Sequence, residues 1–241
     1  MLRKFVLPAT LIFLQIGLTA SLNAQREVKE QEAQQWLQYY GQASLDDHWV
    51  LLVDGGFRWT NFFLIESQFL MRAALGYEFG QGPTISAGYA YLGVYRSDVL
   101  SGYEHRPYQE IKYSHDLSNF TLSHRLRIEE RFFTINDIKS SEVRFRYGIN
   151  LKMLTIPLSR SKPHFKLDLN MGNELFLTAG NELLPNAFSE NRLIFSPNLH
   201  INKQISVALT WNRKLSATIN ESVYNATHII WLQIRHNIAF Y

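Results

Sequence analysis

The sequence predicts an all-β protein, a transmembrane antiparallel up-and-down β-barrel of about 10–12 strands. Three observations predict this fold. The chain ends on a regular amphipathic strand, it begins with a segment typical of exported proteins, and apolar and polar residues alternate with a period of two through most of what lies between.

The C-terminal segment is the most regular element. Within residues 225–241, one face carries Ile230, Leu232, Ile234, His236, Ile238 and Phe240, and the other carries Trp231, Gln233, Arg235, Asn237 and Ala239. Chain termini usually fray. A regular apolar strand in this place suits the closing strand of a membrane barrel, because every backbone group in lipid must pair with a neighbour.

The N-terminus predicts export. The basic pair Arg3-Lys4 precedes an apolar stretch over residues 5–20, and small and polar residues follow up to Ala24. This layout predicts a signal peptide over residues 1–24 and a single outer-membrane barrel domain over residues 25–241. The alternative is an N-terminal anchor, which is disfavoured because the apolar run is shorter than the roughly 20 residues of a spanning helix and contains Pro8. We therefore expect localisation in a bacterial outer membrane.

Composition excludes several functions. Without residues 1–24 the chain keeps 22 of its 24 basic residues against 21 acidic ones, so it is nearly neutral and no nucleic acid is expected as a partner. The absence of cysteine excludes disulfides, thiolate catalysis and Cys-zinc sites. We expect no cofactor and no metal. The expected partners are outer-membrane lipid and, through the C-terminal strand, the barrel-assembly machinery, while any small-molecule or ion ligand stays unknown.

Eleven segments have the length and alternation of strands. They are 34–45, 48–60, 65–79, 83–96, 105–117, 119–133, 141–157, 162–178, 190–201, 204–215 and 226–241. Alternation is sharpest in 69–79, 120–133, 143–153, 165–172 and 205–212. Because bacterial barrels usually have even strand numbers, either residues 25–45 lie inside or beneath a ten-stranded barrel, or one further strand brings the number to twelve.

Three features favour a membrane barrel over a soluble one with an apolar interior. The segments are long for soluble strands, which average about five or six residues. Aromatic residues gather near strand ends, as two interfacial girdles require: Trp49, Phe57, Trp59, Phe62, Phe63, Tyr89, Tyr91 and Tyr95. Connections also alternate between tight turns (46–47, 80–82, 117–119, 159–162 and 202–203) and longer loops (60–66, 97–104, 134–141, 179–189 and 216–224), as periplasmic turns and outer loops do.

Several short motifs carry a family resemblance. They are the strand around Trp36, the runs Glu104-His105-Arg106-Pro107-Tyr108 and Arg125-Leu126-Arg127-Ile128-Glu129-Glu130-Arg131-Phe132, then Val143-Arg144-Phe145-Arg146-Tyr147-Gly148 and Glu190-Asn191-Arg192-Leu193. On these motifs the chain resembles the exported Bacteroidota-type family catalogued as domain of unknown function 2490, over nearly all of residues 25–241. The resemblance implies an outer-membrane β-barrel without an established activity, and it implies no catalytic residues.

The polar face predicts a charged lumen. The lumen-lining candidates are Arg72, Arg125, Arg127, Glu129, Arg131, Arg144, Arg146, Lys152 and Arg235. The favoured interpretation is a rigid plug of ion pairs that closes the barrel. The alternative is a narrow, porin-like channel or cavity whose arginine-rich wall, in segments 119–133 and 141–157, favours anions such as phosphate or carboxylates.

Three other classes remain as alternatives. An outer-membrane lipid hydrolase would need a Ser–His pair, for which Ser114, His115, Ser118, Ser123 and His124 are the candidates, although no Gly-x-Ser-x-Gly motif is present. A soluble exported carrier of apolar ligands would place the apolar faces inside. An interaction protein would use the apolar loop 179–189. Chemistry is therefore uncertain and an enzyme is disfavoured.

Overall fold

The computed structural model describes residues 27–118, 120–180, 187–220 and 222–239. The predicted signal peptide and the last two aromatic residues lie outside this part of the chain. Within it the strands are β1 (Glu27–Glu30), β2 (Gln34–Ser44), β3 (Trp49–Thr60), β4 (Ile65–Glu78), β5 (Thr84–Arg96), β6 (Val99–Leu117), β7 (Phe120–Ile135), β8 (Ile138–Pro157), β9 (Lys166–Ala179), β10 (Phe188–His200), β11 (Ile205–Ala217) and β12 (Val223–Ala239).

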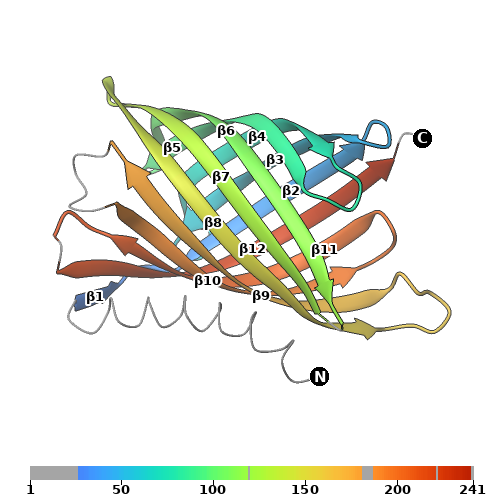
Figure 1. The fold of residues 1–241 in the computed structure, drawn as a ribbon. Coiled ribbons are helices and arrows are strands. Elements are labelled where there is room, and N and C mark those ends of the chain that lie inside the picture. The colour runs from blue at the N-terminus through green and yellow to red at the C-terminus, as the bar shows by residue number, and fades with distance from the viewer. Residues whose placement is uncertain (1–26, 119, 181–186, 221, 240–241) are drawn as a thin grey trace.

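The strands β2 to β12 form one closed sheet of eleven strands (Figure 1). Each strand pairs antiparallel with the next along the chain, which confirms the predicted all-β barrel and a strand number within the predicted range. The segment around Trp36, considered for the inside of a smaller barrel, is β2 and belongs to the wall. No helix in the described residues is long and apolar enough to cross a membrane.

The closure differs from the fully antiparallel arrangement that the sequence predicts. Strand β12 pairs with β2 in parallel, with Ile229 opposite Gln34 and Ala239 opposite Ser44. The short β1 continues along the same edge of β12. The cause is geometric: strands that alternate in direction leave the first and the last of an odd number pointing the same way, so this barrel closes only through a parallel pair.

The predicted alternation of short and long connections is wrong at two places. Only Ser97 and Asp98 separate β5 from β6, and only Asn136 and Asp137 separate β7 from β8. All four residues have positive φ, between 49° and 66°, as two-residue hairpin turns of type I′ require. Asn and Asp tolerate this left-handed conformation, so the strands continue into stretches that the sequence assigned to long loops. At the other end of the barrel, residues 158–165 form one of the longer connections.

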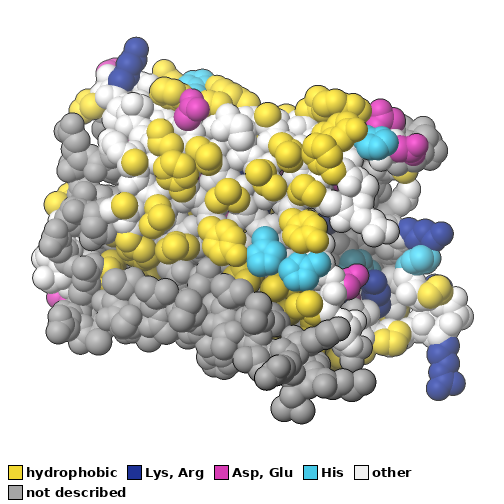
Figure 2. All heavy atoms as spheres, in the orientation of Figure 1, with side chains coloured by type: hydrophobic (Ala, Val, Ile, Leu, Met, Phe, Trp, Pro, Cys, Tyr) yellow, Lys and Arg dark blue, Asp and Glu magenta, His cyan; other side chains and the backbone are white. Residues whose placement is uncertain are grey.

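The two faces of the wall differ in polarity. Large apolar side chains are exposed on the outside, such as Leu209 at 56 % and Ile230 at 45 %, and Figure 2 shows apolar side chains spread over the barrel wall with charged ones near its ends. The interior positions of the same strands are polar, as at Thr210 and Gln233, which are almost fully buried. The arrangement contradicts the apolar interior that a soluble carrier of apolar ligands would need.

Candidate functional site in the barrel interior

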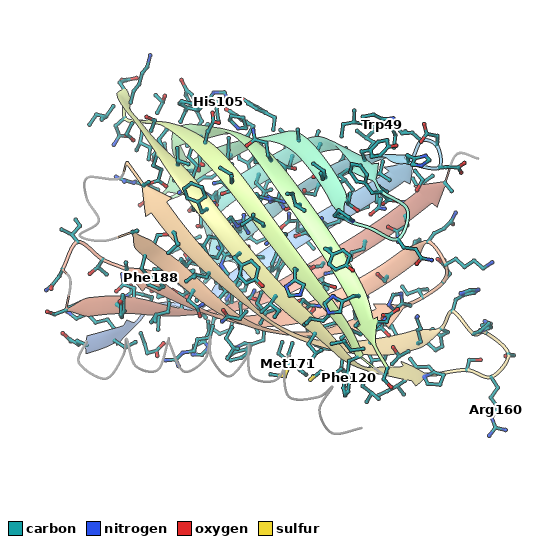
Figure 3. The ribbon with its side chains drawn as sticks, in the orientation of Figure 1. Trp49, His105, Phe120, Arg160, Met171 and Phe188 are labelled. Carbon is teal, nitrogen blue, oxygen red and sulfur yellow. The ribbon has the colours of Figure 1, made fainter. Side chains whose placement is uncertain are left out.

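The charged residues of the interior come from four neighbouring strands, β6 to β9. Because side chains alternate across a strand, positions two apart point to the same face. Glu104, Arg106 and Glu110 of β6 therefore point inward together, as do Arg125, Arg127, Glu129 and Arg131 of β7, Glu142, Arg144 and Arg146 of β8, and Glu174 of β9. Figure 3 shows side chains filling the space that the strands enclose.

Glu129 lies at the centre of this network and is completely buried. Its Oε2 accepts hydrogen bonds from Nε and Nη2 of Arg144, at 2.7 and 2.5 Å, and its Oε1 accepts one from Nη1 of Arg146 at 2.7 Å. Arg127 and Arg106 approach Oε1 to 3.6 and 3.9 Å. Four guanidinium groups thus surround one carboxylate, which keeps it charged in a site without water contact.

Two more carboxylates extend the network toward the β7–β8 hairpin. Glu104 accepts paired hydrogen bonds from Arg106, at 2.6 and 2.8 Å, and from Arg131, at 2.7 and 3.1 Å. Arg131 also donates to Glu142. Since a guanidinium group is planar and carries its donors as a fork, the bidentate contact of Arg131 with Glu104 holds β7 against β6 in a defined geometry.

Glu110 and Glu174 extend the network in the other direction. Arg127 donates to Glu110 at 2.5 Å, and Lys112 lies 2.9 Å from the same carboxylate. Arg146 donates to Glu174 at 2.9 Å, and Arg125 of β7 reaches past β8 to Glu174 as well. Each arginine of the predicted anion-favouring wall therefore contacts a carboxylate.

The network holds more cations than carboxylates. Among the described residues, its carboxylates are Glu104, Glu110, Glu129, Glu142 and Glu174, and its cations are Arg106, Lys112, Arg125, Arg127, Arg131, Arg144 and Arg146. Aromatic rings also stabilise two of these cations. The guanidinium carbon of Arg127 lies 4.2 Å from the centroid of the Tyr108 ring, and the guanidinium carbon of Arg146 lies 4.6 Å from the centroid of the Phe176 ring.

A second part of the interior lies around Trp36 of β2. The ring of Trp231 in β12 meets it edge to face with centroids 5.2 Å apart. The guanidinium carbon of Arg58 lies 4.0 Å from the centroid of the Trp36 ring, and that of Arg192 lies 5.3 Å from it. Arg192 belongs to β10, which is separated from β2 by β11 and β12, so this contact spans the barrel interior.

The remaining predicted lumen residues lie outside the central network. Arg72 forms an ion pair with Asp54 at 2.8 Å. Arg235 donates to Gln233 at 2.6 Å. Lys152 is half-buried near the register shift between β8 and β9.

Sequence reasoning missed Glu104, Arg106, Glu142 and Asp54. Glu104 falls in the predicted loop 97–104, because the predicted strand 105–117 starts too late. Glu142 lies within the predicted strand 141–157 but was not assigned to its inward face. The alternation itself was the available signal: the inward series that contains Glu110 continues backward in steps of two to Glu104.

The serine and histidine candidates do not form a nucleophile–base pair. The hydroxyl of Ser114 donates to Ser123 at 2.8 Å. His124 instead pairs through Nδ1 with the hydroxyl of Tyr147 at 2.9 Å, and His115 stacks on His124 with ring centroids 5.6 Å apart. Adjacent residues of a strand point to opposite faces, so Ser114 and Ser123 face the interior and the two histidines face outward. Ser118 is exposed in the turn between β6 and β7.

The described residues contain no group of three or more His, Cys, Asp or Glu side chains that could hold a metal ion. Of the apolar loop 179–189, residues 181–186 lie outside the described residues, and the ring of Phe188 packs edge to face against Tyr224, with centroids 5.6 Å apart.

Comparison with known proteins gives one match. The model of a family described as protein of unknown function (DUF2490) matches residues 33–225. No curated protein and no solved structure shows significant similarity to the chain.

Proposed function

The chain belongs to the DUF2490 family, and from its geometry we propose that it is a bacterial outer-membrane barrel with a lumen closed by ion pairs, a membrane scaffold rather than an open pore. The observation that carries the proposal is the inverted polarity of the wall: charged side chains are buried inside while large apolar side chains cover the outside. Water disfavours such an exterior and lipid favours it.

Strand length and aromatic placement support the membrane location. A tilted strand needs about 9–11 residues to cross a bilayer. The shortest wall strand, β2, has 11 residues and the others are longer. Aromatic clusters lie near both ends of the wall, such as Trp49 with Tyr77 at one end and Tyr91 with Tyr103 at the other, as interfacial girdles do.

Barrel size and packing support closure of the lumen. About eight strands enclose a space that side chains fill, whereas 16 to 18 leave an aqueous channel, so eleven strands with many long inward side chains lie near the filled limit. The carboxylate of Glu129 makes no contact with solvent, and Arg192 reaches across the interior to Trp36.

The membrane location is tested by fractionation. A closed membrane barrel should partition into detergent and migrate differently in gels before and after boiling. A protein that remains in the aqueous fraction and shows no mobility shift would contradict the proposal.

Closure is tested in planar bilayers with R127S/R146S, which removes two guanidinium groups from the network. We expect the wild-type protein to show no steady conductance and the double variant to conduct, because the substitutions open the most densely filled section. R160S is the matched control, since Arg160 is exposed in the turn between β8 and β9 (Figure 3). Steady conductance of the wild-type protein, or no change in the double variant, would contradict closure.

A further inference from the structure

We propose that Arg58, Arg192 and Lys214 form a binding site for a small dianionic oxyanion, a phosphate monoester or a dicarboxylate, inside one end of the barrel. The inference rests on the proposed barrel with a filled interior and assigns a ligand class to the part of that interior around Trp36. Arg58 is close to the end of β3, Arg192 to the start of β10 and Lys214 to the end of β11, which all lie at the same end of the barrel.

The two arginines converge on one aromatic ring. Both guanidinium carbons lie within 5.3 Å of the centroid of Trp36, although the arginines come from strands on different sides of the interior. The indole face stabilises each cation and holds it against the repulsion of the other. The result is a pair of planar, fork-shaped donors fixed close together, which suits an oxyanion better than a flexible pair would.

Lys214 adds a third cation by register. In the β10–β11 ladder Lys214 lies directly opposite Arg192, and both side chains face the interior. Like charges in directly opposed positions destabilise a sheet. An anion bound between them removes this cost, so the ligand and the strand pairing stabilise each other.

The counter-charge in the described residues is incomplete. Arg192 pairs with Glu190, whereas Arg58 donates to the neutral Gln68 at 2.5 Å, and no carboxylate of the described residues lies within ion-pair distance of Lys214. Three cations and one carboxylate leave a charge of +2. The central network has the same surplus, with seven cations and five carboxylates, but there each cation contacts at least one carboxylate.

Buried polar atoms without partners lie beside these cations. Asn212 points inward two positions before Lys214 and is completely buried, and neither its amide nitrogen nor its amide oxygen has a hydrogen-bond partner among the described residues. The Nε of Arg58 and the Nε1 of Trp231 are also buried and unpartnered in this part of the chain. Buried polar atoms are normally satisfied, and three of these four are donors, as an oxyanion requires.

The proposed site is partly exposed. The side chains of Arg192 and Glu190 keep 13 and 17 % of their surface exposed, while Glu129 of the central network keeps none. Among the described residues, this site is thus more open than the central network. The surplus of two positive charges selects a dianion, and the guanidinium forks select phosphate or carboxylate oxygens over halide.

The test is binding to the purified full-length protein in detergent micelles at pH 8, measured by isothermal titration calorimetry with inorganic phosphate and, separately, succinate. Tryptophan fluorescence provides a second readout because Trp36 lies against the site. We expect saturable binding of at least one probe, with chloride binding at least tenfold more weakly. The tighter probe distinguishes a phosphate ligand from a dicarboxylate.

The variants R58M and K214M should each weaken binding of that probe at least tenfold. K166M is the matched control, because Lys166 is an inward lysine at the opposite end of the barrel, and it should bind within twofold of wild type. Retained heat-modifiability shows that each variant is folded, and it reports on the membrane barrel independently of binding. No saturable binding of either probe, or unchanged affinity in folded R58M and K214M, would overturn the proposal.

Discussion

Replacing Glu129 by glutamine tests the central ion-pair network most directly. The substitution keeps the shape of the side chain but removes the charge that Arg144 and Arg146 contact through hydrogen bonds of 2.5 to 2.7 Å. Either new amide orientation points an NH2 group at a guanidinium. Because Glu129 is completely buried, water does not replace the lost interaction.

Loss of one member of a buried, hydrogen-bonded ion pair costs about 3–5 kcal/mol. We expect E129Q to lower the free energy of unfolding by that amount. The assay is urea unfolding of the protein folded into lipid vesicles, followed by tryptophan fluorescence, with heat-modifiability as a second readout. A decrease of less than about 1 kcal/mol would refute the reasoning, because it would mean that water screens these charges.

The neighbouring residue is a matched control. Glu130 carries the same side chain one position later, so it points to the opposite face and is exposed. E130Q should not lower the free energy of unfolding, because this outward side chain takes no part in the ion-pair network. The double variant E129Q/R146Q should be less destabilised than the sum of the two single variants, by about 0.5–3 kcal/mol, since the residues share one contact. Additive effects would show that they act independently.

Three further predictions concern the closure and the ends of the barrel. Leu37 and Leu232 lie opposite each other in the β2–β12 pairing, with both side chains outward. In this cysteine-free chain, L37C/L232C should therefore form an intramolecular disulfide on oxidation, and failure to cross-link would contradict the parallel pairing. Ser97 and Lys203 lie in turns at opposite ends, so of S97C and K203C only S97C should react with a membrane-impermeant maleimide on intact cells, and labelling of both would contradict a membrane-spanning barrel. Phe62 has a φ of 53°, a left-handed conformation that glycine adopts without strain, so F62G should raise the free energy of unfolding by about 1 kcal/mol in the vesicle assay. A lower free energy of unfolding would show that the exposed ring stabilises the protein by more than the backbone strain costs.

Much of the wall could be predicted because alternation is a local property. The eleven predicted segments correspond to β2 to β12, and most of their boundaries agree within a few residues. The errors follow from turn chemistry. Ser97-Asp98 and Asn136-Asp137 lack the glycine that usually marks a tight hairpin. The predicted segments therefore start later in the chain than β6 and β8 do, and the predicted interior does not include Glu104.

The parallel closure was missed for a different reason. The sequence predicts a strand around Trp36. The resulting odd total of eleven strands was interpreted as an error in the strand assignment, because bacterial barrels usually have even strand numbers. The pairing of β2 with β12 joins residues almost two hundred positions apart, and no local pattern indicates which edge meets which, or in what direction.

The amino-acid sequence alone therefore established that apolar and polar residues alternate along the strands and that each strand has one apolar and one charged face, because alternation depends only on neighbouring residues. Its composition alone excluded cysteine chemistry. The tertiary structure decided which charges meet. Arg125 reaches Glu174 across an intervening strand, and Arg192 joins Arg58 at Trp36 from across the interior. Such contacts depend on strand register and on barrel closure, which together place the arginines of the predicted wall beside carboxylates and leave Arg58 at Trp36 with a neutral partner, Gln68.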